Sequence, residues 1–533
     1  MSQSTSHFDA VVVGAGFSGL YALHKLHNEL GLSVRLYEKG SSVGGTWHWN
    51  RYPGALSDSE TYVYAYSFDD EILQQQDLST RYATQPQVLQ YLQNFADRKG
   101  LSPGIQLNST VTSAHFDEAL NQWRVTVDTG ETVTARYLVM GLGPLSAANV
   151  PDIEGIESFT GEVLHTSNWP EGQDLTGKRV GVIGTGSTGV QLITAIADQV
   201  GNLTVFQRTP QYCVPLGNKP LTDAEIATIR RNYRKIWDDV YESGLAFGFE
   251  ESTVPAMSVS EEERQRIFEE AWQKGGGFYF MFGTFSDIGS NPEANEAAAA
   301  FIRGKIAEIV DDPETARKLT PKDYYARRPV CDSGYYATFN RDNVSLVDVR
   351  ENPIARATTE GLALADGTEI GLDVLVFATG FDAVEGSYRP IDIRGRGNVE
   401  LADHWAKAPR GYLGLTVAGF PNMFTVFGPN SSFCNNPPMI SSQVEWIART
   451  VAFLEEGPHT LIEPTDAAEE EWMAQCEDIA NTTLFPKVES WIFGHNIEGK
   501  PKTARFYMGG LSTYRSILAD VEDRNYEGFA LKS

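Results

Sequence analysis

Short apolar runs, glycine-rich turns and amphipathic helical segments alternate at the start of the chain. Residues 8–13 form a largely apolar run that ends directly in glycine, which predicts a buried strand. Apolar side chains then recur at helical spacing from Tyr21 to Leu30, and residues 33–38 predict a second strand. The same order returns later as a strand, a helix and a strand, at 179–183, 190–197 and 203–207. The pattern therefore predicts two βαβ units of an α/β protein.

The remaining pattern predicts that each unit belongs to a domain built from two separate parts of the chain. Charged, amphipathic helical sequence between Leu221 and Lys322 indicates an insertion, and the apolar run 372–380 predicts a strand that returns to these sheets. The C-terminal residues carry no nucleotide signature of their own and are expected to complete the first domain. We expect two Rossmann-like domains, the first at 1–145 and 385–533 and the second at 146–221 and 331–384, with the helical insertion at 222–330.

Composition and charge exclude several classes of protein. The 533 residues carry 43 basic and 70 acidic side chains, a net charge of −27 that repels polyphosphate, so nucleic acid is not an expected partner. The four cysteines, Cys213, Cys331, Cys434 and Cys476, form no CxxC pair, which argues against a metal site and a disulfide framework. No basic N-terminal region precedes an apolar stretch, and no apolar run is long enough to span a bilayer. We expect a soluble, cytoplasmic protein without a membrane partner; a monomer is compatible with the sequence, which does not determine the oligomeric state.

Both predicted units carry a glycine-rich turn in the position that binds a dinucleotide. Gly14, Gly16 and Gly19 follow the GxGxxG pattern between a strand and a helix. The first glycine allows the tight turn, the second lets the backbone approach a pyrophosphate, and the third lets helix and strand pack. The N-terminus of the helix then offers free N–H groups to the phosphates. The second unit repeats the pattern at Gly184, Gly186 and Gly189.

The residue at the end of the second strand differs in charge between the two units. Glu38 and Arg208 follow the last glycines of their loops, Gly19 and Gly189, by the same 19 residues. A carboxylate can accept hydrogen bonds from both ribose hydroxyls, whereas a guanidinium suits a 2′-phosphate that a carboxylate would repel. The first site should therefore take FAD or NAD, and the second should take NADP. The alternative for either residue alone is a surface charge at a strand end.

Two longer motifs distinguish between the two enzyme classes that use FAD and NADPH together. Disulfide reductases need a CxxC pair beside the flavin, and this chain has none. The chain instead matches GGxWxxxxYPGxxxD at residues 44–58, and FxGxxxHxxxWP through Phe159, Gly161, His165, Trp169 and Pro170. With these motifs the chain resembles the Baeyer–Villiger monooxygenases, which are class B flavoprotein monooxygenases, and among them the cyclohexanone monooxygenases. The resemblance implies that His165 couples the domains; the alternative is that it pins a linker by hydrogen bonds.

The resemblance assigns roles to residues outside these motifs. Residues 326–329 resemble a segment that places Arg328 over the flavin and Arg327 beside Arg208, near the 2′-phosphate. It places Asp58 beside the isoalloxazine, and Trp491 on the nicotinamide ribose. The cofactor-binding residues that it implies are Gly14, Gly16, Phe17, Gly19, Glu38, Gly45, Thr46, Trp47, Asp58, Tyr64, Val111, Asn436, Gly184, Gly186, Ser187, Thr188, Gly189, Arg208, Thr209, Arg327 and Trp491.

The resemblance also implies a reaction and its catalytic residues. NADPH reduces FAD, the reduced flavin takes up O₂ as a C4a-peroxyflavin, and this species converts a ketone, typically cyclic, into a lactone or ester, with sulfoxidation as a side activity. Arg328 would stabilise the anions, Asp58 would orient Arg328, and Trp491 would hold NADP⁺ so that water is excluded. Two alternatives remain open: a sulfide or amine oxygenase of the same flavin class, and a non-catalytic NADPH-binding protein.

The residues expected to line the substrate pocket depart from those of the cyclohexanone type. After Asn430 that type usually reads Gly-Pro-Phe-Thr-Asn-Leu, and this chain reads Ser-Ser-Phe-Cys-Asn-Asn. An asparagine adds a hydrogen-bonding group to an apolar wall, which should matter to a polar or bulkier substrate; neutral drift is the alternative. Glu498 stands where proline is usual, which bears on the closure of that loop. The expected pocket residues are Pro144, Phe427, Phe433, Cys434, Asn436 and Phe506.

Overall fold

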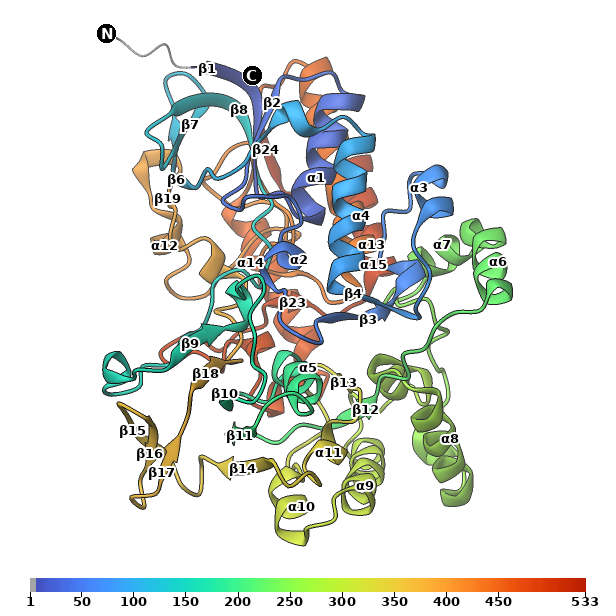
Figure 1. Ribbon diagram of the computed structural model, residues 1–533. Coiled ribbons are helices and arrows are strands. Elements are labelled where there is room, and N and C mark those ends of the chain that lie inside the picture. The colour runs from blue at the N-terminus through green and yellow to red at the C-terminus, as the bar shows by residue number, and fades with distance from the viewer. Residues whose placement is uncertain (1–5) are drawn as a thin grey trace.

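A computed structural model describes residues 6–533, and its largest sheet is built from both ends of the chain (Figure 1). Strand β1 (Ser6–Val13) pairs in parallel with β2 (Val34–Tyr37) and with β8 (Thr132–Met140). The strand order is β19-β6-β7-β8-β1-β2-β5, and β20 also pairs with β8. The other strands are β5 (Ile105–Gln106), β6 (Val111–Asp117), β7 (Gln122–Val127), β19 (Asp392–Arg394) and β20 (Met423–Thr425). Because β19 and β20 come late in the chain, C-terminal residues complete the first sheet.

The second sheet is parallel throughout and carries the second glycine-rich loop. Its order is β14-β11-β10-β18-β9. The strands are β9 (Glu162–His165), β10 (Arg179–Ile183), β11 (Asn202–Gln207), β14 (Val344–Asp348) and β18 (Val374–Phe377). The predicted α/β fold with two dinucleotide-binding domains is thus confirmed, while the domain boundaries stay predictions.

Helices from both ends of the chain pack beside the first sheet. They include α1 (Phe17–Leu23), α4 (Gln85–Arg98), α13 (Asn436–Glu456) and α15 (Leu511–Asp523). Helix α1 packs against α13 (Figure 1). Between them the Tyr21 hydroxyl donates to Glu445 at 3.0 Å. The apolar spacing predicts one regular helix as far as Leu30, but the chain continues from α1 as a π-helical turn, His24–Glu29. This wider turn accommodates the buried ring of His24, which stacks on Phe68 with centroids 5.2 Å apart.

The helical insertion leaves and rejoins the second domain at one pair of strands. Strands β12 (Cys213–Pro215) and β13 (Val330–Asp332) are parallel neighbours. A capping box starts the first helix, because Thr222 and Glu225 each accept the backbone N–H of the other. The helices are α6 (Asp223–Arg231), α7 (Tyr233–Glu242), α8 (Glu261–Lys274), α9 (Pro292–Ile309) and α10 (Pro313–Leu319). The end of the insertion therefore lies next to β13.

Shorter elements complete the two domains. The helices among them are α2 (Thr46–Trp49), α3 (Asp70–Gln75), α5 (Ser187–Ile196), α11 (Tyr335–Thr338), α12 (Leu401–His404) and α14 (Asp466–Asn481). The strands are β3 (Leu56–Glu60), β4 (Tyr82–Thr84), β15 (Ile354–Thr358), β16 (Gly361–Leu364), β17 (Glu369–Gly371), β21 (Ser431–Ser432), β22 (Leu461–Pro464), β23 (Phe506–Tyr507) and β24 (Phe529–Lys532).

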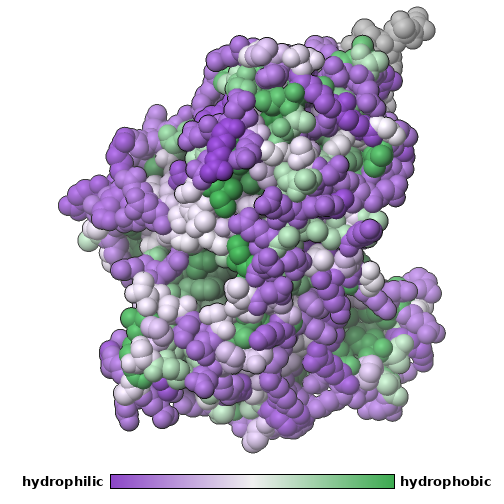
Figure 2. All heavy atoms as spheres, turned by 180° about the vertical axis from the view of Figure 1, so that it is seen from behind, coloured by the Kyte–Doolittle hydropathy of each residue, from purple (hydrophilic) through white to green (hydrophobic). Residues whose placement is uncertain are grey.

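Two linkers join the domains and run side by side. The N–H groups of Asp382 and Val384 donate to the carbonyls of Ala147 and Pro144, at 2.9 and 2.8 Å. The Asn149 N–H donates to the Gly380 carbonyl at 2.9 Å. These bonds form a short ladder, so one linker cannot shift without the other. Figure 2 shows a recess with hydrophobic side chains at the waist of the molecule.

Membrane spans and metal clusters are both absent from residues 6–533. No helix there is long and apolar enough to cross a bilayer. No group of three or more His, Cys, Asp or Glu side chains is placed to hold a metal ion. The four cysteines are buried and free, so none of them forms a disulfide.

Alanine substitutions at two glycines should have opposite effects on stability, because one glycine is required by a tight turn and the other only lowers helix propensity. A Cβ at Gly189 would lie 2.2 Å from the carbonyl oxygen of Gly184, whereas at Gly304, exposed within α9, it would meet nothing within 4 Å. We expect Gly189→Ala to lower the melting temperature, and Gly304→Ala to stabilise the fold by about 0.5–1 kcal/mol. Thermal unfolding of both variants measures this difference, and equal effects would contradict it.

Candidate active site

The first glycine-rich loop is packed tightly around its backbone. Gly14 has a φ of +96°, a conformation that favours glycine. A Cβ on Gly19 would lie 1.7 Å from the carbonyl oxygen of Gly14, so no larger residue fits there. No side chain caps the N-terminus of α1 at Gly16, which leaves its N–H groups available to an anion. The loop therefore has the geometry of a pyrophosphate site.

Glu38 is a buried carboxylate beside this loop. It lies just after β2, is 5% exposed, and accepts the N–H groups of Ala15 and Gly40, each at 2.7 Å. A surface charge at a strand end is therefore excluded. Each carboxylate oxygen keeps a further lone pair, which suits it to accept a ribose hydroxyl.

The loop from Gly44 to Asp58 connects the two domains. A Cβ on Gly45 would lie 2.8 Å from the Gly16 Cα, so the two loops meet backbone to backbone. The Tyr52 hydroxyl donates to Gln191 of α5 at 2.7 Å, and burial raises the pKa of Tyr52 to about 12. Three rings pack edge to face beside this loop, with centroids 5.4 to 5.6 Å apart: Phe17, Trp47 and Tyr64.

The second loop ends in basic side chains. Gly184 has a φ of +112°, and no side chain caps α5 at Gly186. Arg208, exposed just after β11, makes no ion pair or side-chain hydrogen bond within residues 6–533. The Arg350 guanidinium donates to the Thr209 hydroxyl at 3.1 Å. This end of the second sheet can therefore accept an additional phosphate.

Arg327 lies next to the C-terminal segment that carries Trp491. Its guanidinium donates to the Glu489 carbonyl at 2.9 Å and is paired with Asp323. The Glu489 carboxylate is also 3.8 Å from the Arg350 guanidinium. Arg327 is thus joined to the surroundings of Arg208 through Glu489 and Arg350, and its role at a 2′-phosphate stays a prediction.

Asp58 and Arg328 form a partly buried bidentate ion pair. Two guanidinium nitrogens donate to the two carboxylate oxygens at 2.6 and 2.9 Å. Burial alone would lower the pKa of Arg328, but the charge and hydrogen bonds of Asp58 raise it above its ordinary value. Arg328 is therefore a permanent, oriented cation just before β13.

The linker motif is fixed by packing and by hydrogen bonds. The Phe159 ring covers Gly161 so closely that a Cβ there would lie 2.3 Å from the ring. His165 Nδ1 accepts the N–H and the hydroxyl of Ser167, at 3.1 and 2.7 Å. Burial lowers the pKa of His165, so the ring is held neutral. Trp169 is buried and Pro170 is exposed. These contacts agree with a residue that pins a linker.

Aromatic rings from four predicted positions meet at Phe506. Its ring lies 6.0 Å from Phe427, 5.8 Å from Phe433 and 5.8 Å from Trp491, between centroids. Phe427 has a φ of +60°, and its N–H donates to Gln443 at 2.7 Å, which holds this strained backbone in place.

The remaining predicted residues lie near the ends of elements. Cys434 is buried, whereas Asn436 is exposed as the first residue of α13. The Pro144 carbonyl belongs to the linker ladder, and none of the ring contacts at Phe506 includes this residue. The others are Thr46 at the start of α2, Val111 buried at the start of β6, Ser187 and Thr188 at the start of α5, and Thr209 after β11.

A buried ion cluster attaches the C-terminal segment to the second linker. The Lys500 ammonium is paired with Asp382 and lies 2.9 Å from a Glu385 oxygen. Arg505 reaches the same Glu385 oxygen at 3.0 Å. The Asn496 amide donates to the Phe381 carbonyl at 2.8 Å. Trp491 is therefore carried by a segment that rests on the interdomain linker.

Asn435 is a structural centre of the site that the sequence reasoning did not identify. Its amide accepts from the Ser59 hydroxyl at 2.9 Å and donates to the carbonyls of Val63 and Ala246, at 2.9 and 3.0 Å. It thereby joins the strand of Asp58, the helical insertion and the start of α13. Arg350 was also missed; its place directly after the strand neighbouring β11 is the signal that could have found it.

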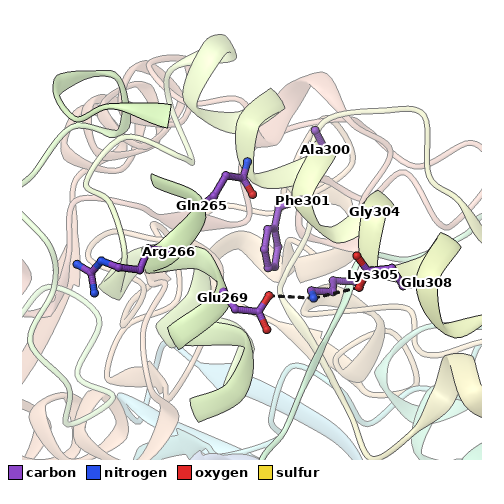
Figure 3. Close-up of a pocket in the computed structure, with 8 residues that line it drawn as sticks. All are labelled: Gln265, Arg266, Glu269, Ala300, Phe301, Gly304, Lys305 and Glu308. Atoms are coloured by element: carbon purple, nitrogen blue, oxygen red, sulfur yellow. Dashed lines mark hydrogen bonds and ion pairs between the residues drawn. The ribbon is translucent and has the colours of Figure 1, made fainter. Parts of the chain in front are cut away.

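A surface groove of about 510 Å³ between α8 and α9 lies outside this site (Figure 3). Lys305 in the groove is paired with Glu269 at 2.8 Å and with Glu308 at 3.1 Å. These charges satisfy one another, and no predicted site residue lines the groove. We assign it no role in the chemistry.

The fold and site define the class of protein. Two dinucleotide-binding units, a carboxylate after one and an arginine after the other, and the absence of disulfides are typical of a two-nucleotide oxidoreductase that does not use a cysteine pair. Residues 11–238 match the pyridine nucleotide-disulphide oxidoreductase family. That match covers the parts that bind nucleotides and fits this class.

Relatives over the whole chain give the family. A Baeyer–Villiger monooxygenase of Pseudooceanicola batsensis is 56% identical, over 97% of this chain and 95% of its own. A phenazine N-monooxygenase of Lysobacter antibioticus is also 56% identical, over 99% and 98%. The crystal structure of a cyclohexanone monooxygenase from Rhodococcus sp. Phi1 bound to NADP⁺ is 57% identical, with a TM-score of 0.99 over 99% of this chain and 100% of that one. The chain belongs to the Baeyer–Villiger monooxygenases.

Two buried histidines and the half-buried His165 predict a loss of stability in mild acid. Burial lowers the pKa of His165, and of His24 and His48, below the ordinary value of 6.5. Below about pH 6.5 the unfolded chain therefore binds more protons than the folded chain, and the free energy of unfolding falls. We expect His165→Asn, whose Oδ1 can still accept from Ser167, to reduce this slope. Urea unfolding at pH 7.5, 6.5 and 5.5 tests it; an unchanged slope would show that His165 contributes nothing.

Proposed function

We propose that this protein catalyses the NADPH- and O₂-dependent Baeyer–Villiger oxidation of cyclic ketones to lactones, with FAD as its bound cofactor. The observation that carries the proposal is the bidentate pair of Asp58 and Arg328, at 2.6 and 2.9 Å, beside the loop that starts at Gly44. The likeness to a cyclohexanone monooxygenase supports a cyclic ketone as the substrate class.

The first glycine-rich loop fits FAD. Glu38 would accept the ribose hydroxyls, and the N–H groups at the start of α1 would hold the pyrophosphate. The glycines at 44 and 45 let their loop approach the first glycine-rich loop closely, and the rings of Trp47 and Tyr64 pack against each other there. FAD, when bound, supplies electron transfer from NADPH and the activation of O₂.

Arg328 acts on charge that develops during the reaction. Its guanidinium stays protonated, so it can stabilise an oxyanion that forms when the ketone carbonyl is attacked. Asp58 fixes the orientation of the guanidinium and balances its charge before the reaction begins. Such a preorganised cation contributes about 3–4 kcal/mol to the stabilisation of a transition state.

The aromatic residues around Phe506 suit the exclusion of water. The rings of Phe427, Phe433 and Trp491 lie 5.8 to 6.0 Å from the Phe506 ring, between centroids, and the Lys500 cluster attaches the segment of Trp491 and Phe506 to the linker. A dry site protects reactive oxygen species from hydrolysis and strengthens the field of Arg328. Asn436, exposed three residues after Phe433, offers an amide that can bond to a polar group on the ketone.

Oxygenation of a nitrogen or sulfur atom is the second candidate function. It is favoured by one observation, the phenazine N-monooxygenase that is as similar to this chain as the Baeyer–Villiger monooxygenase. A non-catalytic NADPH-binding role does not account for the Asp58–Arg328 pair, because neither glycine-rich loop needs it. Product analysis with a cyclic ketone, a thioether and an aromatic N-heterocycle distinguishes among these functions.

Selectivity for NADPH should depend on the arginines of the second domain. We expect the double variant Arg208→Ala, Arg327→Ala to raise the KM for NADPH by about 10–100-fold and to leave the KM for NADH nearly unchanged, because charged hydrogen bonds to a 2′-phosphate are lost. Initial rates with both nucleotides measure this. Arg317→Ala, at an exposed pair with Glu314, is the matched control. Equal use of NADH and NADPH by the wild type would contradict the assignment.

Removal of the Arg328 cation should separate reduction from oxygen transfer. We expect Arg328→Ala to keep anaerobic reduction of FAD by NADPH, and to lower lactone formation by about 10²–10³-fold. Arg328→Lys keeps the charge but loses the bidentate geometry, so its rate of lactone formation should lie between those of the wild type and Arg328→Ala. The measurements are anaerobic bleaching of the flavin and gas chromatography of the products. Wild-type lactone yield in Arg328→Ala would contradict the role of Arg328.

A further inference from the structure

The guanidinium of Arg328 contacts an aromatic ring as well as Asp58. Its Cζ lies 5.1 Å from the centroid of the Phe278 ring, within the range of a cation–π interaction. Phe278 is 4% exposed and stacks on Phe247, with centroids 4.0 Å apart and an interplanar angle of 21°. Asp58 thus holds one edge of the guanidinium while an immobilised ring lies close to it.

The backbone before and after Phe278 is unusual. Gly275 and Gly276 have φ values of +76° and +103°, and a Cβ on Gly276 would lie 2.9 Å from the Tyr82 hydroxyl. A π-helical turn, Tyr279–Gly283, follows directly. Such turns re-aim side chains and are frequent at functional sites. The chain therefore uses two special backbone conformations to set the position of one ring.

Cys331 joins this backbone to the strand that follows Arg328. The Gly277 N–H donates to Cys331 Sγ at 3.1 Å. Burial raises the pKa of the Cys331 thiol to about 12, so it stays neutral and serves as an acceptor. A Cβ on Gly277 would lie 3.2 Å from both Cys331 Sγ and Pro329 Cβ. The residue before Phe278 and the residues after Arg328 are therefore held in contact with each other.

We propose that Phe278, supplied by the helical insertion, is a positioning residue that sets the orientation of the Arg328 guanidinium for oxygen transfer. The proposal rests on the function proposed above. Asp58 fixes one edge of the guanidinium but leaves it free to tilt about that edge. The Phe278 ring removes this freedom through the attraction between the cation and its π face. The interior of the insertion thereby supports the arginine at its end, although none of its helices belongs to a nucleotide-binding unit.

Loss of the Phe278 ring should uncouple NADPH consumption from product formation, without stopping NADPH consumption. In Phe278→Leu, NADPH and O₂ are still consumed, but the two electrons of NADPH leave as H₂O₂ instead of entering product and water. We expect product per NADPH to fall about tenfold and H₂O₂ to rise correspondingly. Phe278→Tyr keeps the ring and should restore wild-type coupling. Phe249→Leu is the matched control, because Phe249 also lies beside Phe247 but does not contact Arg328.

Two further measurements distinguish an electrostatic role from simple packing. Fluorinated phenylalanines placed at 278 keep the shape of the ring and weaken its π face, so coupling should fall stepwise with fluorine content. A double-mutant cycle of Phe278→Leu with Arg328→Gln, measured by unfolding of the FAD-free protein, should show a favourable coupling between the two side chains. The proposal would be overturned if product per NADPH stayed unchanged across the fluorine series and the effects of the two substitutions on unfolding were additive.

The wild-type assays keep this test separate from the proposed function. If the FAD-loaded wild type oxygenates none of the ketone, thioether and N-heterocycle probes, the proposed function fails. The double-mutant cycle alone then tests whether Phe278 and Arg328 interact. If the wild type forms product and Phe278→Leu forms as much of it per NADPH, the function stands and the role of Phe278 is refuted.

Discussion

The ion pair between Asp58 and Arg328 is the constraint on which the rest of the site depends. It joins two residues that lie 270 positions apart, on a loop of the first domain and at the end of the helical insertion. A partly buried charge without its partner costs several kcal/mol, so the pair forms only when both segments are held in place. Much of the surrounding structure does this: Asn435 ties the Asp58 strand to the start of α13, and Cys331 ties β13, the strand after Arg328, to the insertion.

Contacts between the two domains are the second constraint on the site. Tyr52 of the first domain bonds Gln191 of the second, and the two linkers are paired by backbone hydrogen bonds. The segment that carries Trp491 rests on the same linkers through the buried charges around Lys500. The two domains, the second linker and the aromatic rings around Phe506 are therefore mechanically connected. The segment of Trp491 is coupled to the second linker, because Asp382 and Glu385 of that linker bind it.

Local patterns allowed the nucleotide-binding parts to be predicted, because each βαβ unit is formed by about 40 consecutive residues whose strands pair with one another. The positions of Glu38 and Arg208 at the ends of their strands could be predicted from their spacing of 19 residues after the last glycine of each loop. The helix after the first loop was predicted as regular and contains a π-helical turn, because a buried His24 ring has to be accommodated against Phe68. Residues such as Arg350 and Phe278 belong to no motif, and their roles arise from neighbours far away in sequence.

The sequence by itself determined the α/β class, the two nucleotide loops, the opposite charges that follow them and the motifs of the family, since all of these are encoded in short segments. The tertiary structure decided which distant side chains meet: Asp58 with Arg328, Phe506 with Phe427, Phe433 and Trp491, and Asn435 with the strand of Asp58 and the insertion. Contacts of this kind depend on how whole elements pack, and no spacing along the chain records them. The chemistry of the site therefore rests on residue types given by the sequence and on distances given only by the fold.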